Sequence, residues 1–195
     1  MTSAPTPATP EELILLGAAI YQAQKVEWAL YGIAAHASHL PVAQRERRFK
    51  QLTPESFLRG NLAALKATLG QIASRFGEAF LISNPALERF VADRNLIVHD
   101  FYRLFHAKVR DAQHRDDPIE FLNDFCRRCE HWLAIILGLL VVLRERAAEK
   151  EGRTDELVLT DKDQINKAAY LTHANEVAKR LLSESGGHVA SGETE

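Results

Sequence analysis

An arginine and a histidine lie five residues apart in the segment 83–106, at Arg94 and His99, and Asn95 directly follows the arginine. Histidine has a reference pKa of about 6.5, so it transfers protons near neutral pH. Arginine keeps its charge and presents a planar set of donors, which suits a phosphate group that is gaining negative charge. These residue types indicate phosphate chemistry, in which Asn95 either orients the His99 imidazole or binds a phosphate oxygen.

Helical periodicity places Arg94 among apolar side chains. On a helix that turns by about 100° per residue, Arg94 falls between Phe101 and Phe105 on the apolar arc. An unpaired charge is costly to bury, so we expect Arg94 to have a partner or to face a cleft. Glu27 interrupts the apolar line of the first helical segment in the same way. The sequence therefore predicts an ion pair between Glu27 and Arg94, which either locks two helices together or positions Arg94 in a site.

A polar edge lies beside the apolar arc and contains Asn95, His99, Tyr102 and His106. On a regular helix, the side chains of Arg94 and His99 diverge by about 140°. A single helix of this kind therefore does not bring both side chains to one phosphate. In a dimer with a two-fold axis, a second copy supplies the complementary pair of residues across a groove. We therefore expect a homodimer that forms through this helix.

Residues 94–99, RNLIVH, resemble the Arg-polar-x3-His signature of the HEPN superfamily. HEPN proteins are small helical bundles of toxin–antitoxin, CRISPR and phage-defence systems. The resemblance covers residues 85–150 and, loosely, the first helix. It implies a metal-independent endoribonuclease without a cofactor, in which a ribose 2′-hydroxyl of the RNA substrate attacks the adjacent phosphate. It implies catalytic roles for Arg94, Asn95 and His99, with Glu27, Tyr102 and His106 in support.

Some HEPN domains have no catalytic activity and serve as dimerisation or nucleotide-sensing modules. A second function therefore stays open, a domain that binds a partner protein or a nucleotide and in which Arg94 and Glu27 are structural. In an enzyme we expect Arg94 and His99 to reach one solvent-open groove. In a scaffold we expect Arg94 to be buried against Glu27 and His99 to be isolated. A toxin–antitoxin setting also implies an antitoxin or another regulatory protein as a partner.

The densest basic run of the chain is formed by Arg45, Arg47, Arg48 and Lys50, with one aromatic residue among them. This run is either a solvated loop or a patch that binds RNA phosphates. The net charge of the chain is −2, so RNA binding has no help from global charge and needs such a local patch.

Two cysteines, Cys126 and Cys129, lie close to His131. A structural zinc site needs four ligands, usually from two such pairs, and the chain has one pair. The spacing places both thiols on one face of a helix, so we expect buried core cysteines and no metal site. A single pair also cannot form a disulfide framework.

Helix-start signals divide the chain. A capping residue precedes proline at Thr9-Pro10, Thr53-Pro54, Asn84-Pro85 and Asp117-Pro118, and Thr160 with Asp163 marks a fifth start. They predict helices over about 10–38, 54–76, 85–107, 118–151 and 161–184. The expected fold is an all-α, HEPN-like up-and-down bundle of about five helices. A single domain is expected over 10–184, with disordered tails at 1–9 and 185–195.

The composition is that of an ordinary globular protein, with 195 residues of which 46% are hydrophobic and 26% charged. Residues 132–143 are apolar at every position, but a membrane-spanning helix needs about 20 such residues. This segment is expected to be either the central helix of the bundle or part of a subunit interface. The N-terminus has no secretory signal, so we expect a cytoplasmic protein without membrane contact.

Overall fold

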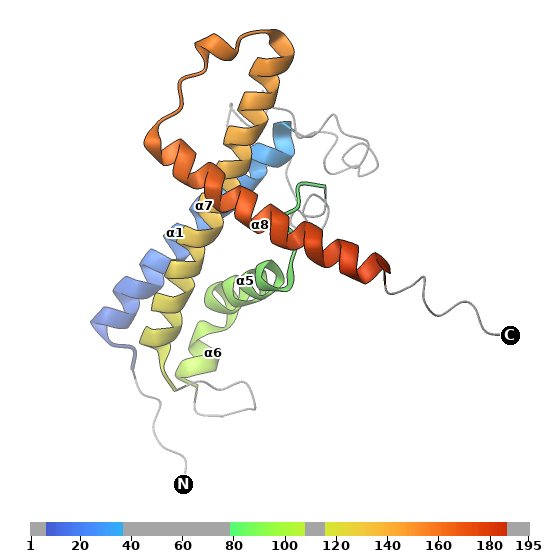
Figure 1. Ribbon diagram of the computed structural model, residues 1–195. Helices are drawn as coiled ribbons and strands as arrows, with labels where there is room; N and C mark the ends of the chain where they lie inside the picture. Colours follow the sequence, from blue (N-terminus) through green and yellow to red (C-terminus); the bar gives the residue numbers. More distant parts are fainter. Residues whose placement is uncertain (1–6, 37–78, 108–115, 187–195) are drawn as a thin grey trace, which may run out of the picture.

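The computed structural model describes residues 7–36, 79–107 and 116–186, and these residues are helical apart from short connections (Figure 1). The elements are α1 (Pro10–His36), α5 (Pro85–Asn95), the π-helical turn η2 (Leu96–Asp100), α6 (Phe101–Phe105), α7 (Pro118–Glu151), the 3-10 turn η3 (Thr154–Glu156) and α8 (Asp161–Gly186). No residue in these ranges belongs to a β-strand. The predicted all-α class is therefore confirmed for the described part of the chain.

Some expectations lie outside the described residues. They are the helix over 54–76, the basic residues Arg45, Arg47, Arg48 and Lys50, and the tails except for residues 7–9 and 185–186. Helix α7 has the expected bounds, and α8 ends two residues later than expected. The helix predicted over 85–107 is divided into α5, η2 and α6 and ends at Phe105. Helix α1 begins as expected at Pro10, and its predicted end at 38 lies outside the described residues.

The predicted caps begin the helices where they were expected. Asn84 Oδ1 accepts a hydrogen bond from the Leu87 N–H at 2.9 Å, and Asp117 Oδ1 accepts one from the Glu120 N–H at 2.8 Å. Two reciprocal caps join a threonine to the acid three residues on: Thr9 to Glu12 and Thr160 to Asp163. Helix α7 is capped by Gly152, whose φ of +68° is the left-handed conformation that glycine adopts without strain.

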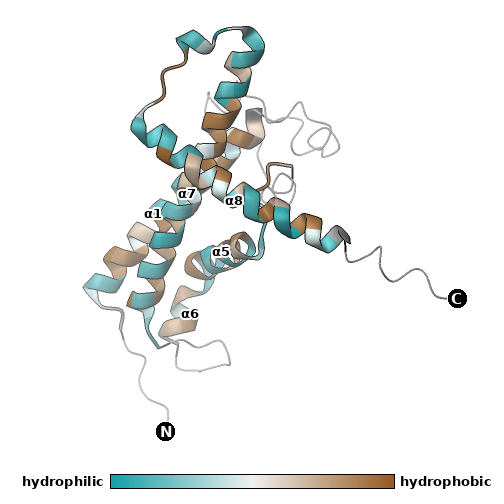
Figure 2. Ribbon diagram, in the orientation of Figure 1, coloured by the Kyte–Doolittle hydropathy of each residue, from teal (hydrophilic) through white to brown (hydrophobic). Residues whose placement is uncertain are grey.

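Helix α7 is central among the described helices, because it packs against α1, α5 and α8 (Figure 1). The Phe125 ring of α7 stacks on Phe90 of α5 at 5.1 Å between centroids, and Trp132 is fully buried beside them. The most hydrophobic stretch of α7 lies near its crossing with α8 (Figure 2). These contacts support a central position for the segment 132–143, although Leu133, Leu137 and Leu140 are only half-buried.

The crossing of α7 and α8 is close because α7 has a glycine there. A Cβ atom at Gly138 would lie 2.0 Å from the carbonyl oxygen of Asn166 on α8. No side chain fits that distance, so the two backbones meet directly at this point. The sequence pattern of residues 132–143 did not indicate this contact, since glycine counts simply as a small apolar residue.

Helix α8 also holds the segment that leads into α5. Three of its side chains are hydrogen-bonded to backbone carbonyls of residues 80–83: Tyr170 to Phe80 at 3.0 Å, His173 to Ile82 at 3.2 Å and Arg180 to Ser83 at 2.8 Å. Leu81 lies within this segment with a φ of +52°, a conformation that is unfavourable for leucine. The helix after Gly152, which the resemblance does not cover, thus positions the N-terminus of α5.

The burial of His173 predicts that the attachment of α8 depends on pH. Its ring is buried edge-on against Trp132, and this burial lowers the pKa of His173, although the hydrogen bond to the Ile82 carbonyl opposes the shift. His131 and Arg180 lower the pKa further, and Glu176 raises it. The His173 ring therefore binds a proton more readily in the unfolded chain than in the folded one. The contribution of the neutral ring to the free energy of unfolding is complete above about pH 6.5 and is lost as the pH falls below that value.

We expect acidification from about pH 7 to about pH 5 to lower the urea midpoint of the wild type more than that of His173→Gln, which carries no titratable ring. Urea titrations of both proteins at several pH values measure this difference. If the urea midpoints of the two proteins change equally with pH, His173 does not contribute to the pH dependence of stability.

Candidate functional site

Arg94 lies at the C-terminal end of α5 and reaches across to α1. Its Nη2 atom lies 2.5 Å from Oε1 of Glu27, and the two side chains are 24% and 14% exposed. The predicted ion pair is thus confirmed, and neither side chain is fully buried. The Nη1 atom donates a hydrogen bond to Asn95 Oδ1 at 3.1 Å. Burial raises the pKa of the nearby Tyr31, and the Glu27 carboxylate raises it further.

The helix changes its winding between Arg94 and His99. Residues 96–100 form the π-helical turn η2, whose hydrogen bonds join residues five apart instead of four apart. This wider turn advances less around the axis per residue than an α-helix. A turn of this kind is expected to give a smaller divergence between Arg94 and His99 than the 140° of a regular helix. π-turns within α-helices are rare and occur frequently at functional sites.

The polar edge predicted for this helix is present over three of its four residues. Asn95, His99 and Tyr102 are exposed. Within the described ranges, the His99 side chain makes no hydrogen bond or ion pair, and the Asn95 amide oxygen accepts a hydrogen bond from Arg94. Of the two roles considered for Asn95, the hydrogen bond that would orient the His99 ring is therefore not made. The ring is accessible to a ligand, and Arg94 already has a partner.

His106 does not belong to this exposed edge, so its predicted position was wrong. Its side chain is buried, with Nε2 3.9 Å from Oε1 of the buried Glu12 on α1. The Tyr102 and Phe101 rings flank it, at 6.2 and 5.9 Å between centroids. The error has a physical cause, because a π-turn precedes His106 and the helix ends at it, so a constant step per residue does not apply.

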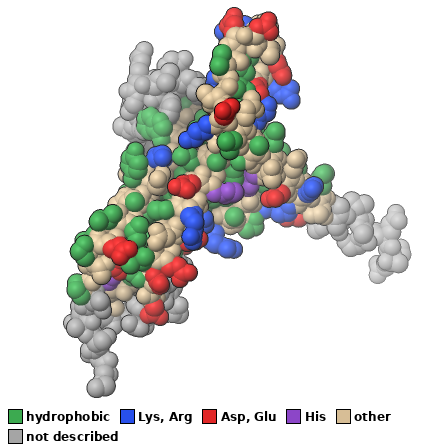
Figure 3. Space-filling model, turned by 60° about the vertical axis from the view of Figure 1, so that its left-hand side comes forward, with side chains coloured by type: hydrophobic (Ala, Val, Ile, Leu, Met, Phe, Trp, Pro, Cys, Tyr) green, Lys and Arg blue, Asp and Glu red, His purple; other side chains and the backbone are tan. Residues whose placement is uncertain are grey.

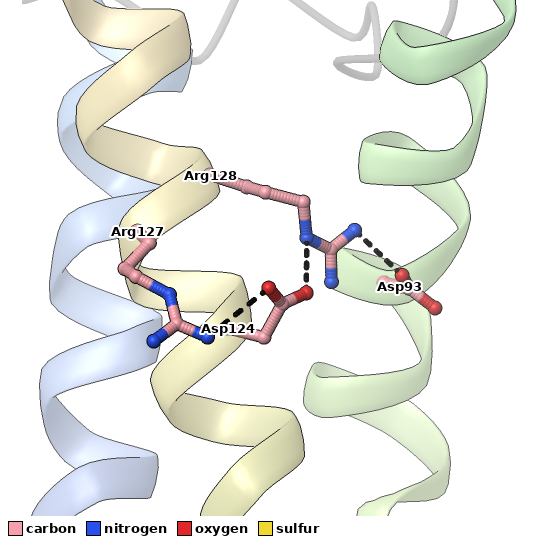
Figure 4. Close-up of polar contacts among 4 residues, drawn as sticks. All are labelled: Asp93, Asp124, Arg127 and Arg128. Carbon is pink, nitrogen blue, oxygen red and sulfur yellow. Dashed lines mark hydrogen bonds and ion pairs between the residues drawn. The ribbon is translucent and has the colours of Figure 1, made fainter.

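Asp93 is a buried acid that the sequence analysis did not single out. Its Oδ2 atom accepts a hydrogen bond from Nη1 of Arg128 on α7 at 2.8 Å, and Arg128 Nε lies 2.9 Å from Asp124 (Figure 4). Arg127 lies 3.4 Å from the same Asp124 carboxylate. The adjacent residues Asp93 and Arg94 thus fasten the end of α5 to two helices, to α7 and to α1.

A signal for Asp93 was present in the sequence. On the same helical projection it lies about 60° from Phe90, beside the apolar position of Ile97. Its partner Arg128 is 35 residues away along the chain, so periodicity within α5 could not identify it.

The surroundings of Cys126 and Cys129 are those of thiols in a hydrophobic core rather than those of metal ligands. Cys129 is buried and Cys126 is half-buried, and burial raises the pKa of Cys129 to about 12. A thiol with this pKa stays protonated at neutral pH and is a poor metal ligand. Among the residues that the structure describes, no group of three His, Cys, Asp or Glu side chains is placed to hold a metal ion.

Comparison with known proteins gives no match: no family model, no curated protein and no solved structure matches this chain. In the described ranges, no helix combines the length and the apolar character needed to cross a bilayer.

The ion pair between Glu27 and Arg94 predicts non-additive stability. We expect Glu27→Ala and Arg94→Ala each to lower the free energy of unfolding by about 1–3 kcal/mol, less than for a fully buried pair because both groups retain solvent. The double variant is expected to lose less than the sum, since each single variant strands one charge. Urea unfolding of the four proteins measures the coupling, and additive losses would show that the pair does not contribute.

Proposed function

We propose that this chain is a metal-independent endoribonuclease of the HEPN type that works as a homodimer in a toxin–antitoxin or phage-defence setting. The observation that carries this proposal is the π-turn η2 between Arg94 and His99. A π-turn advances less per residue than an α-helix, which supports a smaller divergence between the two side chains than 140°, as a shared phosphate requires. The resemblance of residues 94–99 to the HEPN signature supplies the reaction.

Each site residue has a chemical role in this proposal. The ribose 2′-hydroxyl attacks the adjacent phosphorus and loses its proton, the bond to the 5′-oxygen breaks, and that oxygen gains a proton. His99, exposed on the helix, transfers a proton in this step. Arg94 stabilises the charge that develops on the phosphate oxygens, and Glu27 positions its guanidinium. Asn95, which is also exposed, binds a phosphate oxygen, and the exposed Tyr102 supports the site.

A second function is favoured by the ion pair itself. The Arg94 guanidinium is engaged by both Glu27 and Asn95, as expected of a residue with a structural role. In that case the chain is a catalytically inactive, HEPN-like domain that binds a partner protein or a nucleotide. The two functions differ in what happens to RNA, so a cleavage assay separates them.

The experiment is incubation of the purified protein with single-stranded RNA, with RNA from its own host and with DNA of the same sequence. We expect the protein to cleave RNA and not DNA, because the nucleophile is the 2′-hydroxyl. The cleavage rate is expected to be the same with and without EDTA, because no metal takes part. If no RNA is cut, including RNA from the host, the scaffold function replaces the enzymatic one.

A further inference from the structure

Two acidic side chains are buried among the residues that the structure describes, Asp93 and Glu12. By contrast, many Asp, Glu, Lys and Arg side chains reach the molecular surface, as Figure 3 shows for one face. A buried carboxylate is costly unless a cation or a hydrogen-bond donor compensates it. Asp93 directly precedes Arg94, and Glu12 lies 3.9 Å from His106. The two buried carboxylates thus lie at the two ends of the segment that contains the candidate site.

The segment 93–106 is attached to both α1 and α7 at each of its ends. Four contacts make these attachments: Asp93 with Arg128, Arg94 with Glu27, Phe105 with Phe121, and His106 with Glu12. The first and third contacts reach α7, and the second and fourth reach α1. The positions of both ends are therefore determined by two neighbouring helices as well as by the segment itself.

Between these ends the backbone departs from regular α-helical winding. The π-turn η2 covers Leu96–Asp100, and Asp100 has a φ of −126° and a ψ of 4°, outside the α-helical region. π-turns are rare, and unusual backbone conformations persist where the surrounding structure determines them. A helix whose two ends are fixed cannot return to regular winding without breaking a contact at one end. The contacts at the two ends therefore stabilise η2.

The pair of Asp93 and Arg128 is the attachment to α7 nearest to Arg94. The two side chains are 10% and 24% exposed, and the hydrogen bond between them is 2.8 Å long. Arg128 also has two contacts on its own helix. Its Nε atom lies 2.9 Å from the Asp124 carboxylate, and its Cζ atom lies 5.6 Å from the centroid of the Phe125 ring. These contacts orient the guanidinium toward Asp93, so that Arg128 is a defined anchor on α7.

We propose that Asp93 and Arg128 form a positioning pair that stabilises the π-turn η2 and so fixes the place of Arg94. Because η2 lies between Arg94 and His99, the pair also sets the relative placement of these two side chains. Neither member of the pair contacts RNA, and both act through the turn. The effect of the pair on cleavage rests on the proposed ribonuclease function, whereas its effect on η2 does not.

The first test needs no RNA. Hydrogen–deuterium exchange of the full chain, measured by mass spectrometry, compares the wild type with Asp93→Asn and with Glu145→Gln. Glu145 pairs with Lys167 at 2.6 Å between α7 and α8, and these side chains are 23% and 28% exposed, so Glu145→Gln removes a comparable pair away from η2. We expect the amides of residues 96–100 to exchange about 10-fold faster in Asp93→Asn and at the wild-type rate in Glu145→Gln.

Two further variants support the exchange measurement. Asp93→Glu retains the carboxylate and is expected to exchange more slowly at η2 than Asp93→Asn. Arg128→Lys retains the cation but lacks the planar set of donors, and it is expected to act in the same direction as Asp93→Asn. Circular dichroism verifies that each protein is folded, and Arg128→Lys decides the outcome if Asp93→Asn does not fold.

The second test measures RNA cleavage under single-turnover conditions with the same proteins. Asp93→Asn is expected to cleave about 10–10²-fold more slowly than the wild type, because a small displacement of a catalytic group has an effect of this size. Asp93→Glu is expected to recover most of this loss, and Glu145→Gln is expected to cleave at the wild-type rate.

Three results would overturn the proposal. They are unchanged exchange at residues 96–100 in Asp93→Asn, equally faster exchange there in Glu145→Gln, and faster exchange at η2 in a variant that cleaves RNA at the full rate. If the wild type cuts no RNA, the proposed ribonuclease function fails, and the exchange rates alone decide whether the pair stabilises η2.

Discussion

His99→Ala is expected to slow RNA cleavage by about 10²–10⁴-fold, which is the usual contribution of a proton-transferring side chain. The same substitution is expected to change the free energy of unfolding by less than about 1 kcal/mol, because the ring is exposed and bonds to no described residue. Cleavage rates and urea unfolding of the same preparations measure both effects. A large kinetic loss without a loss of stability distinguishes a catalytic histidine from a structural one.

His131→Ala is the matched control, since His131 is also an exposed histidine and lies on α7. It is expected to cleave RNA at the wild-type rate. If His99→Ala retains full activity, or if both variants lose activity equally, His99 does not transfer the proton.

Gly138→Ala is expected to cause the largest loss of stability. The added methyl group would lie 2.0 Å from the Asn166 carbonyl oxygen, so α8 has to move away from α7. Overpacking usually costs about 1–3 kcal/mol and occasionally more, and the backbone contact here places this variant at the upper end of that range. The gain in helix propensity, about 1 kcal/mol, does not offset this cost.

Gly17→Ala provides the opposite case. A Cβ atom at Gly17 has no neighbour within 4 Å, so only the helix propensity changes. We expect a gain of about 0.5–1 kcal/mol, measured by urea unfolding alongside Gly138→Ala. A Gly138→Ala protein as stable as Gly17→Ala would mean that α7 and α8 are not in backbone contact at this point.

Local signals in the sequence determined most of the helix bounds. A cap followed by proline fixes a helix start through a few neighbouring atoms, and the Asn84 and Asp117 caps form as expected. The pairing of Glu27 with Arg94 was also predictable, because two opposite charges on apolar arcs require each other. Both inferences depend on rules that act within one helix or between two charges.

The remaining features depend on contacts between distant residues or on irregular winding. The π-turn η2 has no composition signal, and it invalidates the angular positions that a regular helix assigns to His106. The bond between Asp93 and Arg128 links two helices across 35 residues. Helix α8 is hydrogen-bonded to backbone carbonyls of residues 80–83, and a sequence does not indicate which carbonyls accept such bonds.

The most direct test of the proposed reaction uses an RNA oligonucleotide with a mapped cleavage site and a version with one 2′-deoxyribose at the scissile position. The products of the all-ribose substrate are analysed for their end groups. If the 2′-hydroxyl attacks the adjacent phosphate, the upstream product ends in a 2′,3′-cyclic phosphate and the deoxy substrate is not cut at that site. Cleavage of the deoxy substrate at the same position, or a product without the cyclic phosphate, would contradict the proposed reaction.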